Sequence, residues 1–166
     1  MTTLKNLNDA FAGESMANRK YLAYAKKAEQ DGFPHIAKLF RAVAEAETVH
    51  AHTHLRVLCG VNSTEQNLKA AIEGEGYEYT KMYPQFIAEA DPETEKAAIK
   101  AFKHASAVEE MHQKYYKHAM ETLVKGNDLQ EHKYYICPVC GCTFIDESPD
   151  KCPVCGAAHE RFYEVE

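Results

Sequence analysis

The segment AVAEAETVHAHTHL, residues 42–55, places a glutamate and a histidine three positions apart, at Glu47 and His50. A second segment repeats this Glu-x-x-His spacing at Glu109 and His112. Positions i and i+3 lie on the same face of an α-helix, and both pairs continue a stripe of apolar residues that marks a buried face. Both pairs are therefore predicted to point into the core of a helical protein.

Two other predicted helices carry glutamates on their apolar faces, at Glu14 in the first helix and at Glu75 and Glu78 in the third. Glu14 precedes Glu47 by 33 positions and Glu75 precedes Glu109 by 34, which indicates an internal repeat of two helical hairpins. Buried carboxylates are costly unless positive charge compensates them. A glutamate from each of two helices, with Glu-x-x-His from each of the other two, is the ligand set of ferritin-like di-iron or di-manganese bundles. Oxygen-rich ligands with two imidazoles suit iron or manganese better than structural zinc.

Glycine and proline residues divide most of the chain into long helical segments. These helices are predicted over residues 4–31, 34–58, 64–90 and 92–125. After a linker at 127–133, the sequence changes to short pieces punctuated by proline and glycine. We expect a mainly α protein, with a ferritin-like four-helix bundle over residues 1–129 and a small cysteine-rich metal domain over residues 130–166.

The last thirty residues contain two Cys-Pro-Val-Cys-Gly motifs, which begin at Cys137 and Cys152. Each motif supplies a second cysteine, Cys140 or Cys155, and eleven residues separate the two pairs. Two such knuckles can enclose one tetrahedral metal ion. Zinc and iron both accept four thiolates in this geometry, so a structural zinc ribbon and a redox-active iron site both remain open. Cys142 is expected to be a spectator.

Composition excludes several classes of function. The net charge is −6, and no cluster of lysine and arginine forms the basic stripe that nucleic-acid binding requires. No apolar run approaches the roughly 20 residues that span a membrane, and no export signal precedes the helices. We expect a soluble, cytoplasmic protein. A Gly-x-Gly-x-x-Gly motif is absent, so the chain is not expected to bind NAD(P)H itself.

The helix motifs resemble those of the rubrerythrin family. The resemblance is carried by AFAGES at residues 10–15, ETVH at 47–50, NLKAAI at 67–72 leading into Gly74-Glu75, and EEMH at 109–112. An additional carboxylate, Glu78, separates this family from ordinary ferritins. The resemblance extends over nearly the whole chain and makes the cysteine segment resemble a rubredoxin domain, which favours iron over zinc at the four cysteines.

The resemblance implies a role for each ligand of a di-iron site. Glu47 and Glu109 would bridge the two irons. Glu14 would bind the first iron, whereas Glu75 and His112 would bind the second. Glu78 would bind one iron in the oxidised state, and His50 would replace it on reduction. Tyr21 and Tyr83 match tyrosines that donate hydrogen bonds to ligand carboxylates, although a tyrosine on an inner helix face also serves simply as core packing.

The implied activity is reduction of hydrogen peroxide to water by two irons, each giving one electron. The cysteine-bound iron would return electrons that come from a separate NAD(P)H-dependent reductase or a rubredoxin. Two other functions stay open. One is a ferroxidase that handles iron, and the other is a metal-binding electron carrier with a structural zinc ribbon.

The connection between the second and third helices is short for this fold. In a ferritin-like bundle these two helices run parallel, so the chain must cross the bundle between them, a distance of roughly 35 Å at 1.5 Å per helical residue. The five residues 59–63 reach only roughly 17 Å when extended. Either the helices run simply up and down, or the first hairpin of one chain packs on the second hairpin of a partner. The resemblance favours this domain-swapped dimer.

Overall fold

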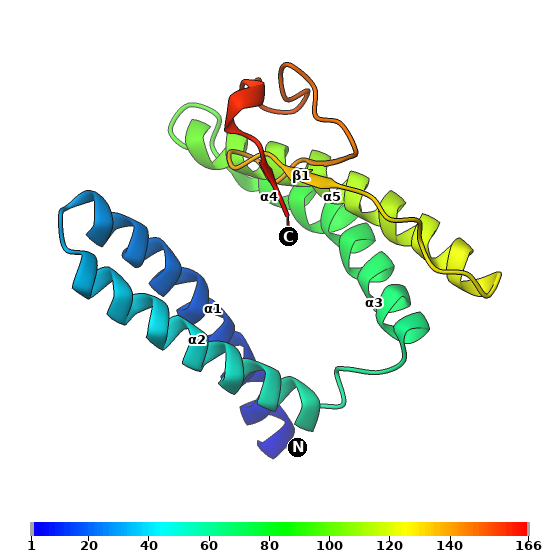
Figure 1. Ribbon diagram of the computed structural model, residues 1–166, viewed down its shortest axis with the longest axis horizontal. Helices are drawn as coiled ribbons and strands as arrows, with labels where there is room; N and C mark the ends of the chain where they lie inside the picture. The colour runs from blue at the N-terminus through cyan, green and yellow to red at the C-terminus, as the bar shows by residue number, and fades with distance from the viewer. Residues whose placement is uncertain (1, 166) are drawn as a thin grey trace. The chain divides into compact units, whose positions relative to one another are not determined.

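The structure, a computed structural model of the chain, describes residues 2–165 and is mainly helical, as predicted. The chain forms two compact units, one that ends at Asn62 and one that begins at Ser63 (Figure 1). The helices are α1 (Thr2–Gln30), α2 (Pro34–Val57), α3 (Thr64–Tyr77), the π-helix η1 (Glu78–Met82), α4 (Tyr83–Glu89), α5 (Lys96–Val124) and the short 3-10 helix η2 (His159–Arg161). The strands are β1 (Tyr134–Ile136), β2 (Thr143–Ile145) and β3 (Tyr163–Glu164). None of the described helices is both long and apolar enough to cross a membrane.

The first unit is a helical hairpin in which α1 and α2 lie side by side (Figure 1). Gly32 makes the turn with a φ of 84°, a conformation that glycine adopts without steric cost. The two helices pack closely because their contact is made of small side chains. Ala25, Ala28 and Ala37 are buried there, and Phe40 packs against them. The backbones of α1 and α2 therefore approach closely, and side chains on their facing turns can meet.

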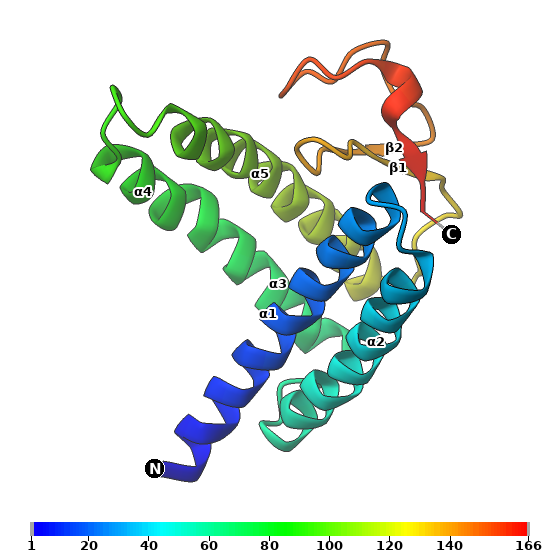
Figure 2. The same ribbon diagram turned by 90° about the vertical axis from the view of Figure 1, so that its left-hand side faces the viewer.

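The second unit places α3 and α4 along α5 (Figure 2). Ser63 caps α3 through a reciprocal pair of hydrogen bonds with Gln66. Gly76 permits the close approach of α3 and α5. A Cβ atom at Gly76 would lie 2.2 Å from Nε2 of Gln113, the amide that donates to the Ile72 carbonyl at 3.0 Å.

The helix predicted over residues 64–90 is present as three contiguous helical pieces, but its middle is not α-helical. Residues Glu78–Met82 form a π-helix, in which the N–H of Tyr83 donates to the carbonyl of Glu78, five residues back. This wider turn accommodates one additional residue and therefore changes which later side chains share a face with Glu75. Single π-turns inside α-helices occur frequently at functional sites.

The fourth long helix begins at Lys96, not at Pro92 as predicted. Asp91, which directly precedes the predicted start, caps a turn and not this helix. Its Oδ1 accepts a hydrogen bond from the N–H of Glu93, and its Oδ2 accepts one from the Thr94 hydroxyl. Both contacts stabilise a local turn, which is the usual alternative to helix for aspartate followed by proline.

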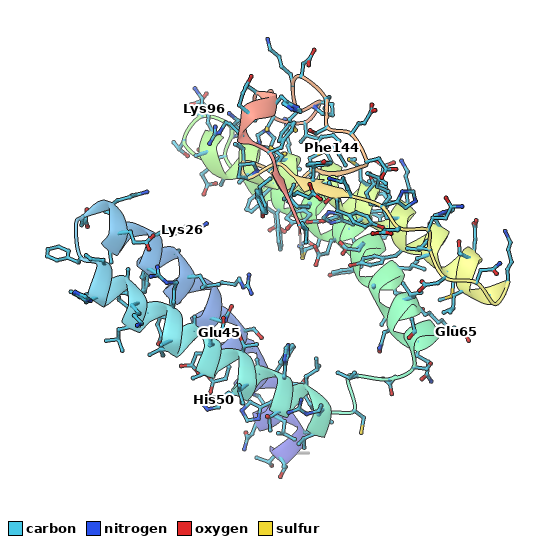
Figure 3. The ribbon with its side chains drawn as sticks, in the orientation of Figure 1. Lys26, Glu45, His50, Glu65, Lys96 and Phe144 are labelled. Carbon is cyan, nitrogen blue, oxygen red and sulfur yellow. The ribbon has the colours of Figure 1, made fainter. Side chains whose placement is uncertain are left out.

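The cysteine-rich segment is a small antiparallel sheet with strand order β2-β1-β3. It packs on α5 within the second unit. Val108 of α5 is 2% exposed and shares a core with Cys137, Cys142 and Cys152. Phe144 of β2 packs against this core (Figure 3).

Candidate metal centres

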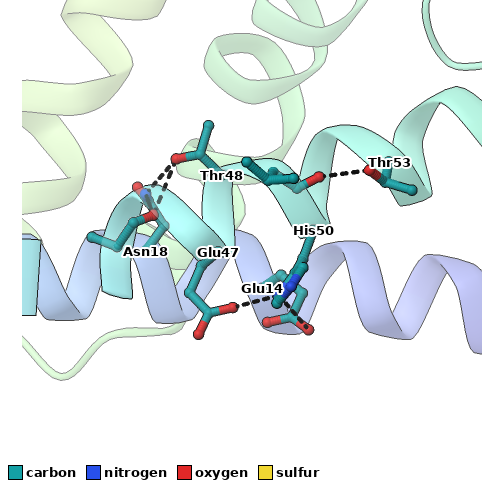
Figure 4. Close-up of polar contacts among 8 residues, drawn as sticks. Glu14, Asn18, Glu47, Thr48, His50 and Thr53 are labelled. Atoms are coloured by element: carbon teal, nitrogen blue, oxygen red, sulfur yellow. Dashed lines mark hydrogen bonds and ion pairs between the residues drawn. The ribbon is translucent and has the colours of Figure 1, made fainter. Parts of the chain in front are cut away.

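The first hairpin brings together three of the predicted ligands. The Nδ1 atom of His50 lies 3.0 Å from Oε2 of Glu47 and 4.0 Å from Oε1 of Glu14 (Figure 4). One donor atom from each residue falls within 4.8 Å of the others. The Glu47 side chain is 15% exposed and the His50 side chain 55% exposed, so the histidine is the more open ligand.

An amide that the sequence analysis missed aligns these two helices. Asn18 lies one turn after Glu14 and is buried, and its Nδ2 donates to the Ala44 carbonyl at 2.7 Å and to the Thr48 hydroxyl at 2.8 Å (Figure 4). Thr48 directly follows Glu47. These hydrogen bonds therefore fix the register of α1 against α2 at the level of the two carboxylates. The sequence could have indicated the role of Asn18, because it is a polar residue on the inner face of the helix, four positions after the predicted ligand Glu14.

The second unit repeats the arrangement with Glu75, Glu109 and His112, whose donor atoms also lie within 4.8 Å of one another. The Nδ1 atom of His112 is 2.8 Å from Oε2 of Glu109. Burial raises the pKa of Glu75, and the neighbouring Glu109 carboxylate raises it further. Glu78 lies beside this triad, and its pKa is raised by burial and then by the charge of Glu75.

The donor chemistry fits metal ions at these clusters. In each unit two carboxylates converge on one imidazole, and in the second unit like-charge repulsion disfavours ionisation of the glutamates. A cation reverses that penalty, since it pairs with the ionised forms. Each unit supplies one glutamate and one Glu-x-x-His pair, which is half of the ligand set of a two-metal carboxylate site.

The two predicted tyrosines have different surroundings. Burial raises the pKa of Tyr83, and three nearby carboxylates raise it further, so the phenol stays protonated. Those carboxylates belong to Glu78, Glu109 and Glu75. Tyr21 packs in an aromatic group, with its ring 6.2 Å from both Tyr24 and Phe40. No described residue forms a hydrogen bond with either hydroxyl, so the role of each in binding a ligand carboxylate stays a prediction.

The four predicted cysteine ligands converge in the C-terminal segment. The Sγ atoms of Cys137 and Cys155 are 3.6 Å apart, and those of Cys140 and Cys152 are 3.5 Å apart. Sulfur ligands about 2.3 Å from a tetrahedral metal lie roughly 3.8 Å from one another, so the spacing suits one metal ion. Gly141 and Gly156, which follow the two knuckles, have φ values of 81° and 76°.

The thiols of this segment differ in acidity. Burial opposes ionisation of Cys152, but backbone N–H groups of Cys155 and Val154 and the neighbouring thiols lower its pKa to about 7. Burial raises the pKa of Cys142 to about 12. Cys142 lies outside the group of four, and its Sγ is 3.6 Å from the sulfur of Met111. This placement supports its interpretation as a spectator to metal binding.

Comparison with known proteins identifies the family. Residues 5–120 match the family model for rubrerythrin. The chain belongs to the rubrerythrin family. Residues 135–163 match a second model, the rubredoxin-like domain of rubrerythrin. Rubrerythrin-2 of Clostridium acetobutylicum is 36% identical over 94% of this chain and 92% of its own length. Nigerythrin of Nitratidesulfovibrio vulgaris is 33% identical over 97% of this chain and 85% of its own length.

Solved structures give the same assignment. Nigerythrin in a mixed-valence state superimposes with a TM-score of 0.57, at 33% identity, over 98% of this chain and 86% of the other. Its fully reduced, all-ferrous state gives a TM-score of 0.58, at 32% identity over the same shares. Rubrerythrins are di-iron oxidoreductases of oxidative-stress defence with a second, rubredoxin-like iron site, and this chain carries a donor set for each centre.

Proposed function

We propose that this rubrerythrin reduces hydrogen peroxide to water at a di-iron centre that is supplied with electrons through an iron bound by four cysteines. The supporting observation is that one chain holds both a group of four converging cysteines and two matching carboxylate–histidine triads. A ferritin-type iron store has no use for the cysteine group. A separate reductase or rubredoxin would donate the electrons, and a cytoplasmic location stays a prediction.

The proposed ligands of the di-iron centre are Glu14, Glu47, His50, Glu75, Glu78, Glu109 and His112. When bound, the two ferrous ions supply the two electrons that, with two protons, convert one hydrogen peroxide molecule into two water molecules. Cys137, Cys140, Cys152 and Cys155 would hold the third iron, which exchanges one electron at a time. Glu47 and Glu109 are the proposed bridging carboxylates.

The two histidines differ in a way that supports exchange of ligands at only one iron. The Nε2 atom of His112 lies 3.2 Å from the Thr143 hydroxyl, whereas no described residue forms a hydrogen bond with Nε2 of His50. The ring without this second contact is freer to approach or leave a metal. Glu78 lies at the first residue of the π-helix, outside the Glu75 triad, which suits a carboxylate that binds in one oxidation state and withdraws in the other.

We also propose that each complete di-iron centre is shared between two chains. Ten residues separate Glu47 from the end of α2 at Val57, and eleven separate the start of α3 at Thr64 from Glu75. If α2 and α3 run parallel, the connection must span about 31 Å at 1.5 Å per helical residue. The seven Cα steps from Val57 to Thr64 reach about 24 Å when extended. A domain swap removes this mismatch, because the two hairpins of one site then belong to different chains.

The test of function is anaerobic addition of hydrogen peroxide to the fully reduced protein, with the absorption of both iron centres followed in time. Rapid stoichiometric oxidation is expected. Cys140→Ser protein, reduced chemically, should react once but fail to turn over with a protein electron donor. Faster oxidation by dioxygen than by peroxide would indicate a ferroxidase, and the absence of colour from the cysteine site would indicate zinc.

A matched pair of variants separates loss of the di-iron centre from general damage. Glu109→Gln removes a proposed bridging ligand and should abolish peroxide reduction while the cysteine centre keeps its absorption. Glu110→Gln changes the next residue, an exposed glutamate that pairs with Lys114 at 2.7 Å, and should leave the reaction unchanged. Equal loss in both variants would contradict the ligand assignment.

A further inference from the structure

The imidazole of His112 is held at both ring nitrogens. Its Nδ1 faces Glu109, and its Nε2 lies 3.2 Å from the hydroxyl of Thr143. Thr143 opens β2, three residues after the cysteine ligand Cys140. A residue of the cysteine-rich segment therefore contacts a proposed ligand of the di-iron centre directly.

The surrounding acceptors define the direction of this hydrogen bond. The Thr143 hydroxyl is also 3.2 Å from the carbonyl oxygen of Gly141. A carbonyl can only accept, so the single hydroxyl proton of Thr143 goes to Gly141. The hydroxyl oxygen must then accept the proton on Nε2 of His112. On the other side of the ring, Nδ1 faces the Glu109 carboxylate at 2.8 Å, and a bound metal ion would replace the proton between these two atoms while Nε2 keeps its own.

The strand that carries Thr143 is anchored on α5 by neighbouring contacts. The hydroxyl of Tyr115, one turn of α5 beyond His112, donates to the Thr143 carbonyl at 2.9 Å. On the other side, Cys142 is fully buried against Val108 and contacts Met111. Apolar packing around Cys142, the hydrogen bond from Tyr115 and the hydrogen bond to Gly141 therefore hold Thr143 in place.

The contact also has a backbone connection to the cysteine ligands. The N–H of Cys137 donates to the carbonyl of Cys142 at 2.9 Å, and Cys142 is bonded to Thr143. The path from the sulfur of Cys137 to the imidazole of His112 thus consists of covalent bonds and two hydrogen bonds. By contrast, no described residue forms a hydrogen bond with Nε2 of His50, so the repeat of the two hairpins does not extend to this feature.

We propose that Thr143 is the positioning residue for His112: it selects the Nε2-protonated form of the ring, orients Nδ1 toward the metal, and couples the cysteine site to the di-iron site. This inference rests on the proposed function, since it takes His112 as a metal ligand. Partners that hydrogen-bond the second nitrogen of a ligating histidine typically contribute about 10- to 100-fold to metal affinity.

The test uses cobalt(II) added to the full protein that keeps iron in its cysteine site. Thr143→Val removes the hydroxyl but keeps the shape of the side chain, and Thr143→Ser restores the hydroxyl. Thr122→Val is the matched control, because among residues 2–165 the Thr122 hydroxyl bonds only to the His118 carbonyl within α5. Cobalt affinity is measured by titration. The exchangeable His112 Nε2–H resonance, shifted by the paramagnetic cobalt, is followed by proton NMR in H2O and D2O.

We expect Thr143→Val to bind cobalt about tenfold or more weakly at the carboxylate cluster. Its His112 N–H resonance should exchange rapidly with solvent, whereas Thr143→Ser and Thr122→Val should behave like the unaltered protein. An unchanged affinity and a slowly exchanging resonance in Thr143→Val would overturn the proposal. Failure of Thr143→Ser to restore both would also overturn it, because the hydroxyl would then not be the cause. If the unaltered protein bound no cobalt at the cluster, the proposed metal site itself would be wrong.

Discussion

Insertion of about twelve glycine and serine residues between Gly60 and Val61 should convert a dimer into a monomer that keeps its di-iron centre. If α2 and α3 run parallel in one site, the present connection is about 8 Å shorter than the required span, once the lateral distance between helix axes, about 9 Å, is included. With the insertion, the eighteen or so connecting residues have a root-mean-square span of about 23 Å and an extended reach of roughly 60 Å. A span of about 32 Å is then accessible at a small cost in loop-closure entropy.

The measurement is molar mass by light scattering together with the number of irons per chain. The unaltered protein should be a dimer with three irons per chain, and the insertion variant a monomer with the same iron content at low concentration. An equal insertion between Asn127 and Asp128, beyond α5, serves as the control and should leave the dimer intact. A monomeric unaltered protein with a full di-iron centre would refute the swap and support four helices that run simply up and down.

Three other outcomes are expected. Co-refolding of Glu47→Ala chains with Glu109→Ala chains should restore one intact di-iron centre per heterodimer. In a swapped heterodimer both substitutions fall in one of the two sites, and the second site has all its ligands. Heterodimers no more active than either mutant alone would contradict the swap. Val108→Ala should lower the free energy of unfolding by about 2 kcal/mol, from two lost methyl groups and a partial cavity, which corresponds to about 4–8 °C in the melting temperature by calorimetry. The raised pKa of Glu75 means that the metal-free protein loses stability as the pH rises from below 4.5 through that pKa. Glu75→Gln should therefore stabilise the metal-free protein at pH 7, by less than about 1 kcal/mol because the carboxyl is partly solvated. A lower melting temperature of this variant would show that the Glu75 carboxylate does not destabilise the protein.

Short-range rules were sufficient to predict much of the fold and the glutamates, histidines and cysteines that the structure brings together. The turn at Gly32 and the cap at Ser63 depend on the conformational preferences of single residues. The spacing within each Glu-x-x-His pair and each cysteine knuckle is also local. Such features are visible in one sequence because the residues that interact are three or four positions apart.

The features that sequence analysis missed depend on contacts between distant segments. Pro84 lies just after the π-turn and Pro92 precedes the start of α5 at Lys96, but a proline indicates only that the helix is disturbed, not that it forms a π-turn or begins four residues later. Asn18 meets Ala44 across the hairpin, and Thr143 meets His112 across 31 positions. A polar residue on an inner helix face signals that some partner exists, but a single sequence does not identify the partner.

The burial of Cys142 has a consequence for damage by oxidants. Peroxides attack thiolates rather than thiols, and the first product is a sulfenic acid. With its pKa raised to about 12 and its side chain fully enclosed, Cys142 remains a protonated thiol at neutral pH. The cysteine two residues from the proposed iron ligand Cys140 is thus kept in the form that peroxide attacks least, whereas the other cysteine outside the group of four, Cys59, is exposed.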